Sequence, residues 1–119
     1  KGAQWNRGAY LVNALSHCGE CHTPRNLMGG LKDGLHLSGT KDGPDSDTVP
    51  NITPHTTGIS DWSDNDLDTL FTLGMLPDGD FVGGGMAEVV ENTDRMTQED
   101  RKAIMIYLKS TPAIASNTK

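Results

Sequence analysis

The sequence is poor in the residues that build a protein interior. Apolar residues make up 34% of its 119 residues and aromatic residues 5%, and both fractions are low for a globular domain. Its 14 glycines and 6 prolines favour loops. A single short domain of this composition has difficulty forming a core from side chains alone. We therefore expect a metal or a large apolar cofactor to supply buried surface.

Other absences each exclude a class of protein. No stretch approaches the roughly 20 consecutive apolar residues of a membrane span. Residues 1–4 lack the basic start and apolar run of a signal peptide, so we expect a mature or trimmed chain. The two cysteines, Cys18 and Cys21, lie too close in sequence for a disulfide between distant segments. The net charge of −6 argues against nucleic acid as a partner.

Basic residues are absent from residues 42–94, which carry twelve acidic residues. Residues 1–41 and 95–119 each have a net charge of +3. An acidic segment such as residues 42–94 usually keeps a protein soluble. The alternative is that it forms a docking surface for a basic partner.

Three segments have the apolar periodicity of helices, at residues 4–16, 64–73 and 98–110. The first places four apolar residues near one face. These are Trp5, Ala9, Val12 and Leu15. Gly8 lowers the helix propensity of this segment, so a helix here needs a packing reason for the glycine.

The second and third predicted helices carry terminal signals. Ser63 with Asp66, and Thr97 with Asp100, have the spacing of a capping box. Gly74 is suited to end the second helix, and a proline follows the third.

Residues 23–62 and 74–96 show little periodicity and are expected to be loops. Loops of this length are unusual in a compact domain unless they enclose a bound group. We expect one domain at residues 1–112. Residues 113–119 are expected to form a C-terminal tail or a cut linker.

The residues Cys18-Gly19-Glu20-Cys21-His22 form the Cys-x-x-Cys-His signature of c-type haem attachment. Two thiols at this spacing can form thioethers with the two vinyl groups of one porphyrin edge. The imidazole of His22 can then bind the iron from one face. The motif predicts one covalently bound haem c, with His22 as a metal ligand.

Three alternatives explain the cysteines less well. A Cys-x-x-Cys redox site usually follows a strand, and none is predicted before Cys18. A zinc site needs two further ligands, and the chain has no second cysteine pair. If the cysteines were inert buried residues, nothing would supply the buried surface that the low apolar content leaves missing.

The chain resembles class I cytochromes c, in particular the cytochrome c domains of bacterial periplasmic dehydrogenases that oxidise alcohols or gluconate. The likeness covers residues 5–112. It rests on the haem motif and on the following elements in order: residues 22–25 (HTPR), 50–54 (PNITP), 57–59 (TGI), 62–63 (WS), 77–80 (PDGD), 86–90 (MAEVV), 100–104 (DRKAI) and 107–110 (YLKS). The resemblance implies an all-α fold in which three main helices and long loops wrap one haem.

A methionine is the expected second axial ligand of the iron. Met28 lies too close to His22 in sequence to cross the haem, Met105 is expected in the core, and Met96 beside the last helix. Met75 and Met86 remain. Three glycines before Met86 suit a close approach to the haem, and the resemblance also implies Met86. Many relatives have Met-Pro here, whereas this chain has Met-Ala, a change expected to make the iron–sulfur bond easier to displace.

Haem propionates need partners when they are partly buried. Arg25 can bind a carboxylate through two donors, and Trp62 can offer its indole N–H. Asn51 and Thr53 are further candidates for hydrogen bonds to a propionate.

The resemblance implies that the first and last helices cross closely. Gly8 then allows Tyr107 to approach, and Tyr10 is expected to share this structural role. The remaining three histidines are expected at the surface rather than at the iron. These are His17, His36 and His55.

These features predict a one-electron carrier rather than an enzyme. The resemblance implies a periplasmic location, with tethering to a membrane complex as an alternative to a free carrier. It also implies a dehydrogenase upstream and an oxidase or another cytochrome downstream. The alternative is an open haem site that binds a gas or peroxide. Such a site usually has a distal His or Arg near the iron, and His55 is the one weak candidate for this residue. A third interpretation, one domain of a larger electron-transfer subunit, leaves the redox role intact.

Overall fold

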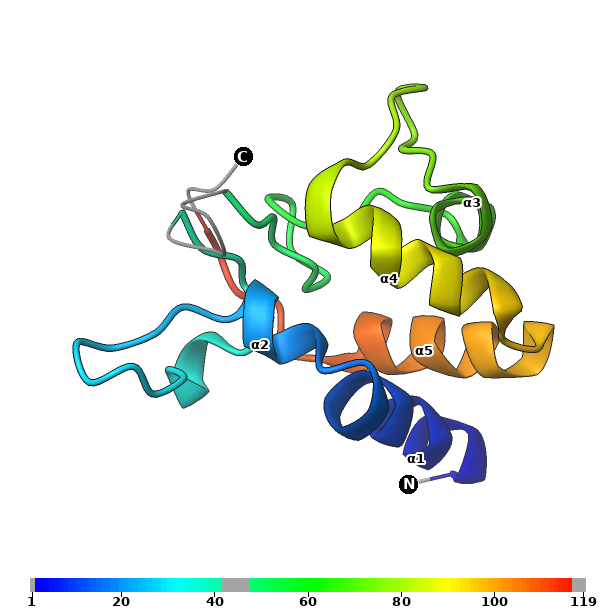
Figure 1. The fold of residues 1–119 in the computed structure, drawn as a ribbon. Helices are drawn as coiled ribbons and strands as arrows, with labels where there is room; N and C mark the ends of the chain where they lie inside the picture. The colour runs from blue at the N-terminus through cyan, green and yellow to red at the C-terminus, as the bar shows by residue number, and fades with distance from the viewer. Residues whose placement is uncertain (1, 42–47, 117–119) are drawn as a thin grey trace.

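The structure, a computed structural model, describes residues 2–41 and 48–116 as helices joined by irregular loops (Figure 1). The helical elements are α1 (Ala3–Tyr10), the π-helical turn η1 (Leu11–Leu15), α2 (Cys18–His22), the 3₁₀ turn η2 (Asp33–Leu35), α3 (Asp64–Leu73), α4 (Gly84–Arg95) and α5 (Gln98–Ser110). Within these ranges there is no β-strand, only isolated bridges, which confirms the all-α prediction. No helix in the same ranges has the length and apolar character needed to cross a membrane.

The packing of α1 against α5 explains the glycine in the first helix. A Cβ atom at Gly8 would lie 2.1 Å from the carbonyl oxygen of Ala103 and 2.9 Å from Cβ of Tyr107. The rings of Trp5 and Tyr107 pack with their centroids 5.2 Å apart. The predicted contact between Gly8 and Tyr107 is confirmed.

The N-terminal helical segment departs from the regular period that the sequence predicts. α1 ends at Tyr10, and a π-helical turn follows. A π turn holds more residues than an α turn, so later side chains rotate away from the 3.6-residue pattern. Val12 is buried as predicted, but Leu15 is 55% exposed. The structural role predicted for Tyr10 is wrong, because its side chain is 51% exposed and lies beside the guanidinium of Arg7.

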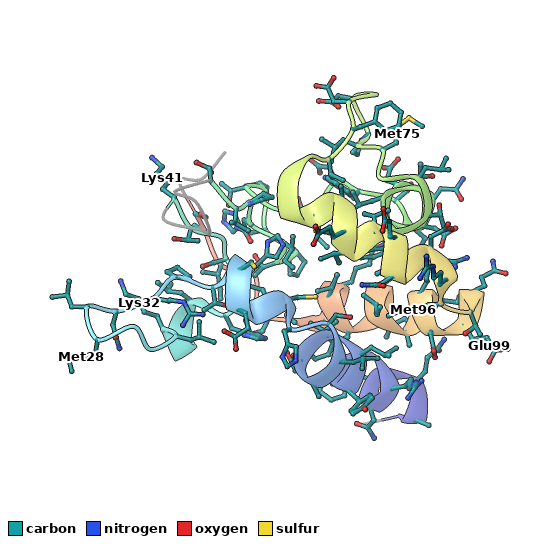
Figure 2. The ribbon with its side chains drawn as sticks, viewed as in Figure 1. Met28, Lys32, Lys41, Met75, Met96 and Glu99 are labelled. Atoms are coloured by element: carbon teal, nitrogen blue, oxygen red, sulfur yellow. The ribbon has the colours of Figure 1, made fainter. Side chains whose placement is uncertain are left out.

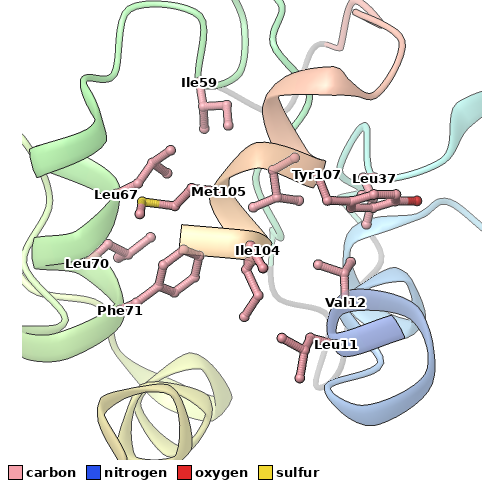
Figure 3. Packing of buried hydrophobic residues seen from close by; sticks show 12 residues of the cluster. Leu11, Val12, Leu37, Ile59, Leu67, Leu70, Phe71, Ile104, Met105 and Tyr107 are labelled. Carbon is pink, nitrogen blue, oxygen red and sulfur yellow. The ribbon is translucent and has the colours of Figure 1, made fainter. Parts of the chain in front are cut away.

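The core lies on both sides of α5 (Figure 3). Leu67 and Phe71 from α3 lie on one side, with Met105, and Leu11 and Val12 from η1 lie on the other. The apolar stripe predicted for the second helix and the core position of Met105 are therefore confirmed.

The predicted ends of α3 are confirmed. Ser63 Oγ accepts a hydrogen bond from the backbone of Asp66, and the Asp66 carboxylate accepts one from the backbone of Ser63. Gly74 closes the helix in a left-handed conformation with φ of 72°, which glycine adopts without the steric cost of a side chain.

The cap of α5 is only half of the predicted box. Thr97 Oγ1 accepts a hydrogen bond from the backbone N–H of Asp100, 3.1 Å away. The Asp100 carboxylate instead binds Arg7 of α1 at 3.1 Å and 3.2 Å. The acidic residue thus joins the two crossing helices instead of completing the cap.

The prediction that residues 74–96 form a loop is wrong for most of that segment, because α4 occupies Gly84–Arg95. Val90 and Thr93 are its buried positions. Thr93 Oγ1 donates a hydrogen bond of 2.6 Å to the carbonyl of Phe71, which fixes α4 to the last turns of α3.

The chain after α5 returns to the loop that contains Asn51 and Thr53. The backbone carbonyl of Ile114 accepts a hydrogen bond of 2.7 Å from Asn51 Nδ2. The division between a domain at 1–112 and a tail at 113–119 stays a prediction, and residues 117–119 lie outside the described ranges.

We predict that Gly8→Ala lowers the free energy of unfolding by about 2 kcal/mol or more, because the added methyl group forces α1 and α5 apart. Denaturant unfolding of the two proteins measures this difference. Gly34→Ala is the control, since a Cβ atom there meets no other atom within 4 Å. Equal stability of Gly8→Ala and Gly34→Ala would contradict the close helix crossing.

Candidate haem site

One helical turn, α2, carries both cysteines and His22. The spacing of three residues places Cys18 and Cys21 on neighbouring positions of one helix face. Both are free thiols, Cys18 half-buried and Cys21 exposed. Cys18 also packs against the apolar core. The turn therefore presents two thiols, one at the edge of the core and one toward solvent.

The imidazole of His22 is held in one orientation. Its side chain is buried, and Nδ1 lies 2.8 Å from the carbonyl oxygen of Pro50. A carbonyl only accepts hydrogen bonds, so Nδ1 carries the proton and Nε2 keeps its lone pair. Burial lowers the pKa of His22 and outweighs the opposing effect of the Pro50 carbonyl. A neutral imidazole with Nε2 unprotonated is the form that binds a metal.

The cysteine environment disfavours the two other thiol chemistries. Burial raises the pKa of the Cys18 thiol to about 11, whereas a redox dithiol requires a lowered value. Across residues 2–41 and 48–116, no three His, Cys, Asp or Glu side chains gather as a metal site. The thiols are thus suited to covalent attachment rather than to zinc binding.

A cavity of about 380 Å³ lies between η1 and α4. Its lining is Leu15, Ser16, Val89, Asn92 and Met96. Leu15 and Ser16 lie three and two residues before Cys18 in the sequence, and the lining includes none of Cys18, Cys21, His22 and Met86. No sequence pattern predicted this cavity, because none predicted α4.

The methionines occupy very different positions (Figure 2). Met28 is 93% exposed in a projecting loop, and Met105 is buried in the core. Met75 lies in the loop between α3 and α4, far from α2 in the view, while Met96 lies near α5. Met86 is half-buried in the first turn of α4, where the sequence had predicted a glycine-rich loop.

Arg25 and Trp62 are two of the predicted propionate partners, and Arg25 is exposed. Arg25 is paired with the Glu20 carboxylate at 2.7 Å and also donates to the Gly29 carbonyl at 2.8 Å. Trp62 is half-buried against the core. Their role toward a propionate stays a prediction, and for Arg25 it competes with the ion pair to Glu20.

Asn51 and Thr53 are buried and bonded to the protein itself. Asn51 Nδ2 donates to Thr57 Oγ1 at 2.9 Å and to the Ile114 carbonyl at 2.7 Å. A side-chain amide has two such protons. A hydrogen bond from Asn51 to a propionate, as predicted, would therefore require one of these bonds to break.

The three other histidines differ in exposure, and His55 is bonded within its own loop. His17 is exposed at the start of α2 in a left-handed conformation, and His36 and His55 are half-buried. Nδ1 of His55 accepts a hydrogen bond of 3.0 Å from the backbone N–H of Thr57. This bond turns His55 toward its own loop.

Comparison with known proteins identifies the fold family. The chain is 48% identical over 108 residues to the diheme cytochrome c-type of Cereibacter sphaeroides. It is 42% identical over 115 residues to the fructose dehydrogenase cytochrome subunit of Gluconobacter japonicus. These alignments cover 91% and 95% of the chain. The chain is a c-type cytochrome domain.

A third relative of this cytochrome domain is the cytochrome c subunit of the quinone-dependent alcohol dehydrogenase of Gluconobacter oxydans, 38% identical over 116 residues. The domain spans 36%, 23% and 24% of the lengths of these three relatives, in the order given. No family model matches the chain. A covalently bound c-type haem fits the residues present, since two free thiols and a neutral, oriented imidazole form one turn.

We predict that the haem of the cytochrome domain stays with the chain after denaturation. Cys21→Ala retains it through one thioether, whereas the double variant Cys18→Ala, Cys21→Ala releases it to acidic organic solvent. Intact mass spectrometry and extraction measure this. His17→Ala is the control and retains the haem. Extraction of the haem from the unmodified domain would contradict covalent attachment.

Proposed function

We propose that this domain transfers single electrons through one covalently attached haem c, with His22 and Met86 as the axial ligands of its iron. The observation that carries the proposal is the hydrogen bond from His22 Nδ1 to the Pro50 carbonyl, which leaves Nε2 ready to bind a metal. The single Cys-x-x-Cys-His motif supports one haem. When bound, the haem supplies an iron that alternates between the ferric and ferrous states.

The residues of α2 and the loop at Pro50 keep the ligand in place. Cys18 and Cys21 anchor the cofactor, and His22 presents Nε2 from a buried position. A fixed imidazole needs little rearrangement when the charge on the metal changes. This rigidity favours electron transfer over substrate chemistry, which needs an open coordination position.

Met86 is the better candidate for the second ligand. It is half-buried at the start of α4, whereas Met75 lies in the loop between α3 and α4, at the top of the view in Figure 2. A thioether ligand raises the reduction potential relative to a second histidine. The pair His22 and Met86 therefore suits a carrier that accepts electrons readily.

The partners follow from the names of the relatives. Two of them are named cytochrome subunits of dehydrogenases. We infer that this domain accepts electrons from a dehydrogenase and passes them to an oxidase or another cytochrome of a respiratory chain. We also infer a periplasmic location, because covalent haem attachment suits an oxidising compartment. We infer further that the domain belongs to a longer electron-transfer unit, because it spans 36% or less of the three relatives named above.

We predict that Met86→Ala abolishes the weak long-wavelength absorption band that arises from sulfur bound to ferric haem. The side chain of alanine offers no ligand, so the iron becomes high-spin or binds an exogenous ligand such as cyanide. Optical spectra of the oxidised and reduced protein measure the change. Met75→Ala is the matched control and keeps the band.

Two results would contradict this ligand assignment. Loss of the band in Met75→Ala, with Met86→Ala unchanged, would move the ligand to Met75. A high-spin spectrum of the unmodified protein that shifts with carbon monoxide would instead indicate an open site for a gas or peroxide.

We predict that electron transfer to a small cationic metal complex slows as salt concentration rises. The exposed acidic residues of α4 lie beside the positions that line the cavity, and salt screens their attraction. They are Glu88, Glu91 and Asp94. Stopped-flow rates measure the effect, and an anionic complex is the control with the opposite trend. Equal salt dependence for both complexes would contradict an acidic approach surface.

A further inference from the structure

Two segments that are far apart in sequence share one buried polar network, the loop of residues 50–57 and the segment of residues 114–116. Asn51 Oδ1 accepts hydrogen bonds from the backbone N–H of Thr53 at 2.8 Å and from Thr53 Oγ1 at 2.7 Å. Asn51 Nδ2 donates to Thr57 Oγ1 and to the Ile114 carbonyl. The Ile114 and Ser116 backbones donate back to Thr53 Oγ1 and Thr57 Oγ1, at 3.1 Å and 3.0 Å.

This network is saturated at its centre. Both protons and both lone-pair directions of the Asn51 amide are used, and Thr53 has no exposed surface. Buried polar networks of this kind are rigid, because each lost bond leaves an unpaired group away from water. The loop is therefore held in one conformation by residues 114–116.

The network ends one peptide bond away from the contact with His22. The carbonyl of Pro50, which accepts the His22 Nδ1 proton, belongs to the planar peptide unit that begins Asn51. Fixing Asn51 therefore fixes the direction of that carbonyl.

The opposite side of the same peptide unit is also fixed. A Cβ atom at Gly39 would lie 2.7 Å from the carbonyl carbon of Pro50 and from the nitrogen of Asn51. Gly39 has φ of 89°, and its N–H donates to the His22 carbonyl at 2.6 Å. The peptide unit is thus packed between Gly39 and the buried network.

We propose that Asn51 and Thr53 are positioning residues for His22, acting through the Pro50 carbonyl and anchored by residues 114–116. The proposal rests on the proposed function, since it concerns His22 as a haem ligand. A hydrogen bond at Nδ1 makes the imidazole more basic and stabilises ferric iron. Weakening the network therefore raises the midpoint reduction potential.

Thr53→Val tests the proposal in the haem-loaded protein. Valine keeps the shape of the side chain and removes the hydroxyl shared by Asn51 and Ile114. Thr53→Ser restores the hydroxyl. Thr93→Val is the matched control, because Thr93 is equally buried and its hydroxyl binds Phe71, outside this network.

Two measurements separate positioning from general stability. Solvent exchange of the His22 Nδ1 proton, followed by NMR in the reduced protein, becomes about tenfold faster in Thr53→Val. The midpoint potential rises in the same variant. Thr53→Ser returns both toward the original values, and Thr93→Val changes neither, although it lowers stability.

Equal Nδ1 exchange and equal potential in Thr53→Val and Thr93→Val would overturn the positioning role. If Thr53→Val does not yield haem-loaded protein, Thr57→Val interrupts the same network at Asn51 Nδ2 and Ser116, with the same expected result. Failure of the proposed function is distinct, because the unmodified protein itself would then lack the spectrum of a histidine-ligated low-spin haem.

Discussion

The hydrogen bond between His22 Nδ1 and the Pro50 carbonyl joins the turn that carries the cysteines to the loop that faces it. It decides which nitrogen of the imidazole keeps a lone pair, and burial keeps the ring neutral. The other features support this contact. Gly39 and the Asn51 network hold the acceptor in place.

The core contains few apolar side chains, and its helices compensate by packing closely against one another. Gly8 permits backbone contact between α1 and α5, and α5 serves two faces of the core at once (Figure 3). A cavity remains between η1 and α4. The composition predicted a bound group that supplies buried surface, because so few apolar residues do not fill a domain of this length.

The sequence predicted those features whose signal is local. The haem motif, the box at Ser63 and the turn at Gly74 depend on residues a few positions apart. The helix α4 was missed because its three leading glycines indicate a loop, although Val90 and Thr93 already lie at helical spacing. The bonds of Asn51 and the pairing of Asp100 with Arg7 depend on partners distant in sequence, and no local pattern reports them.

The position of residues 114–116 has a consequence for the order of events during folding. Cys18, Cys21 and His22 lie within five residues of one another, whereas the loop around Pro50 is completed by contacts with residues 114–116, about 60 positions further along the chain. Contacts between such distant positions form slowly, because a long chain must first be closed. The turn with the two thiols is therefore expected to form before the native surroundings of His22 are complete, which leaves the thiols accessible at the stage when the proposed haem attachment would take place.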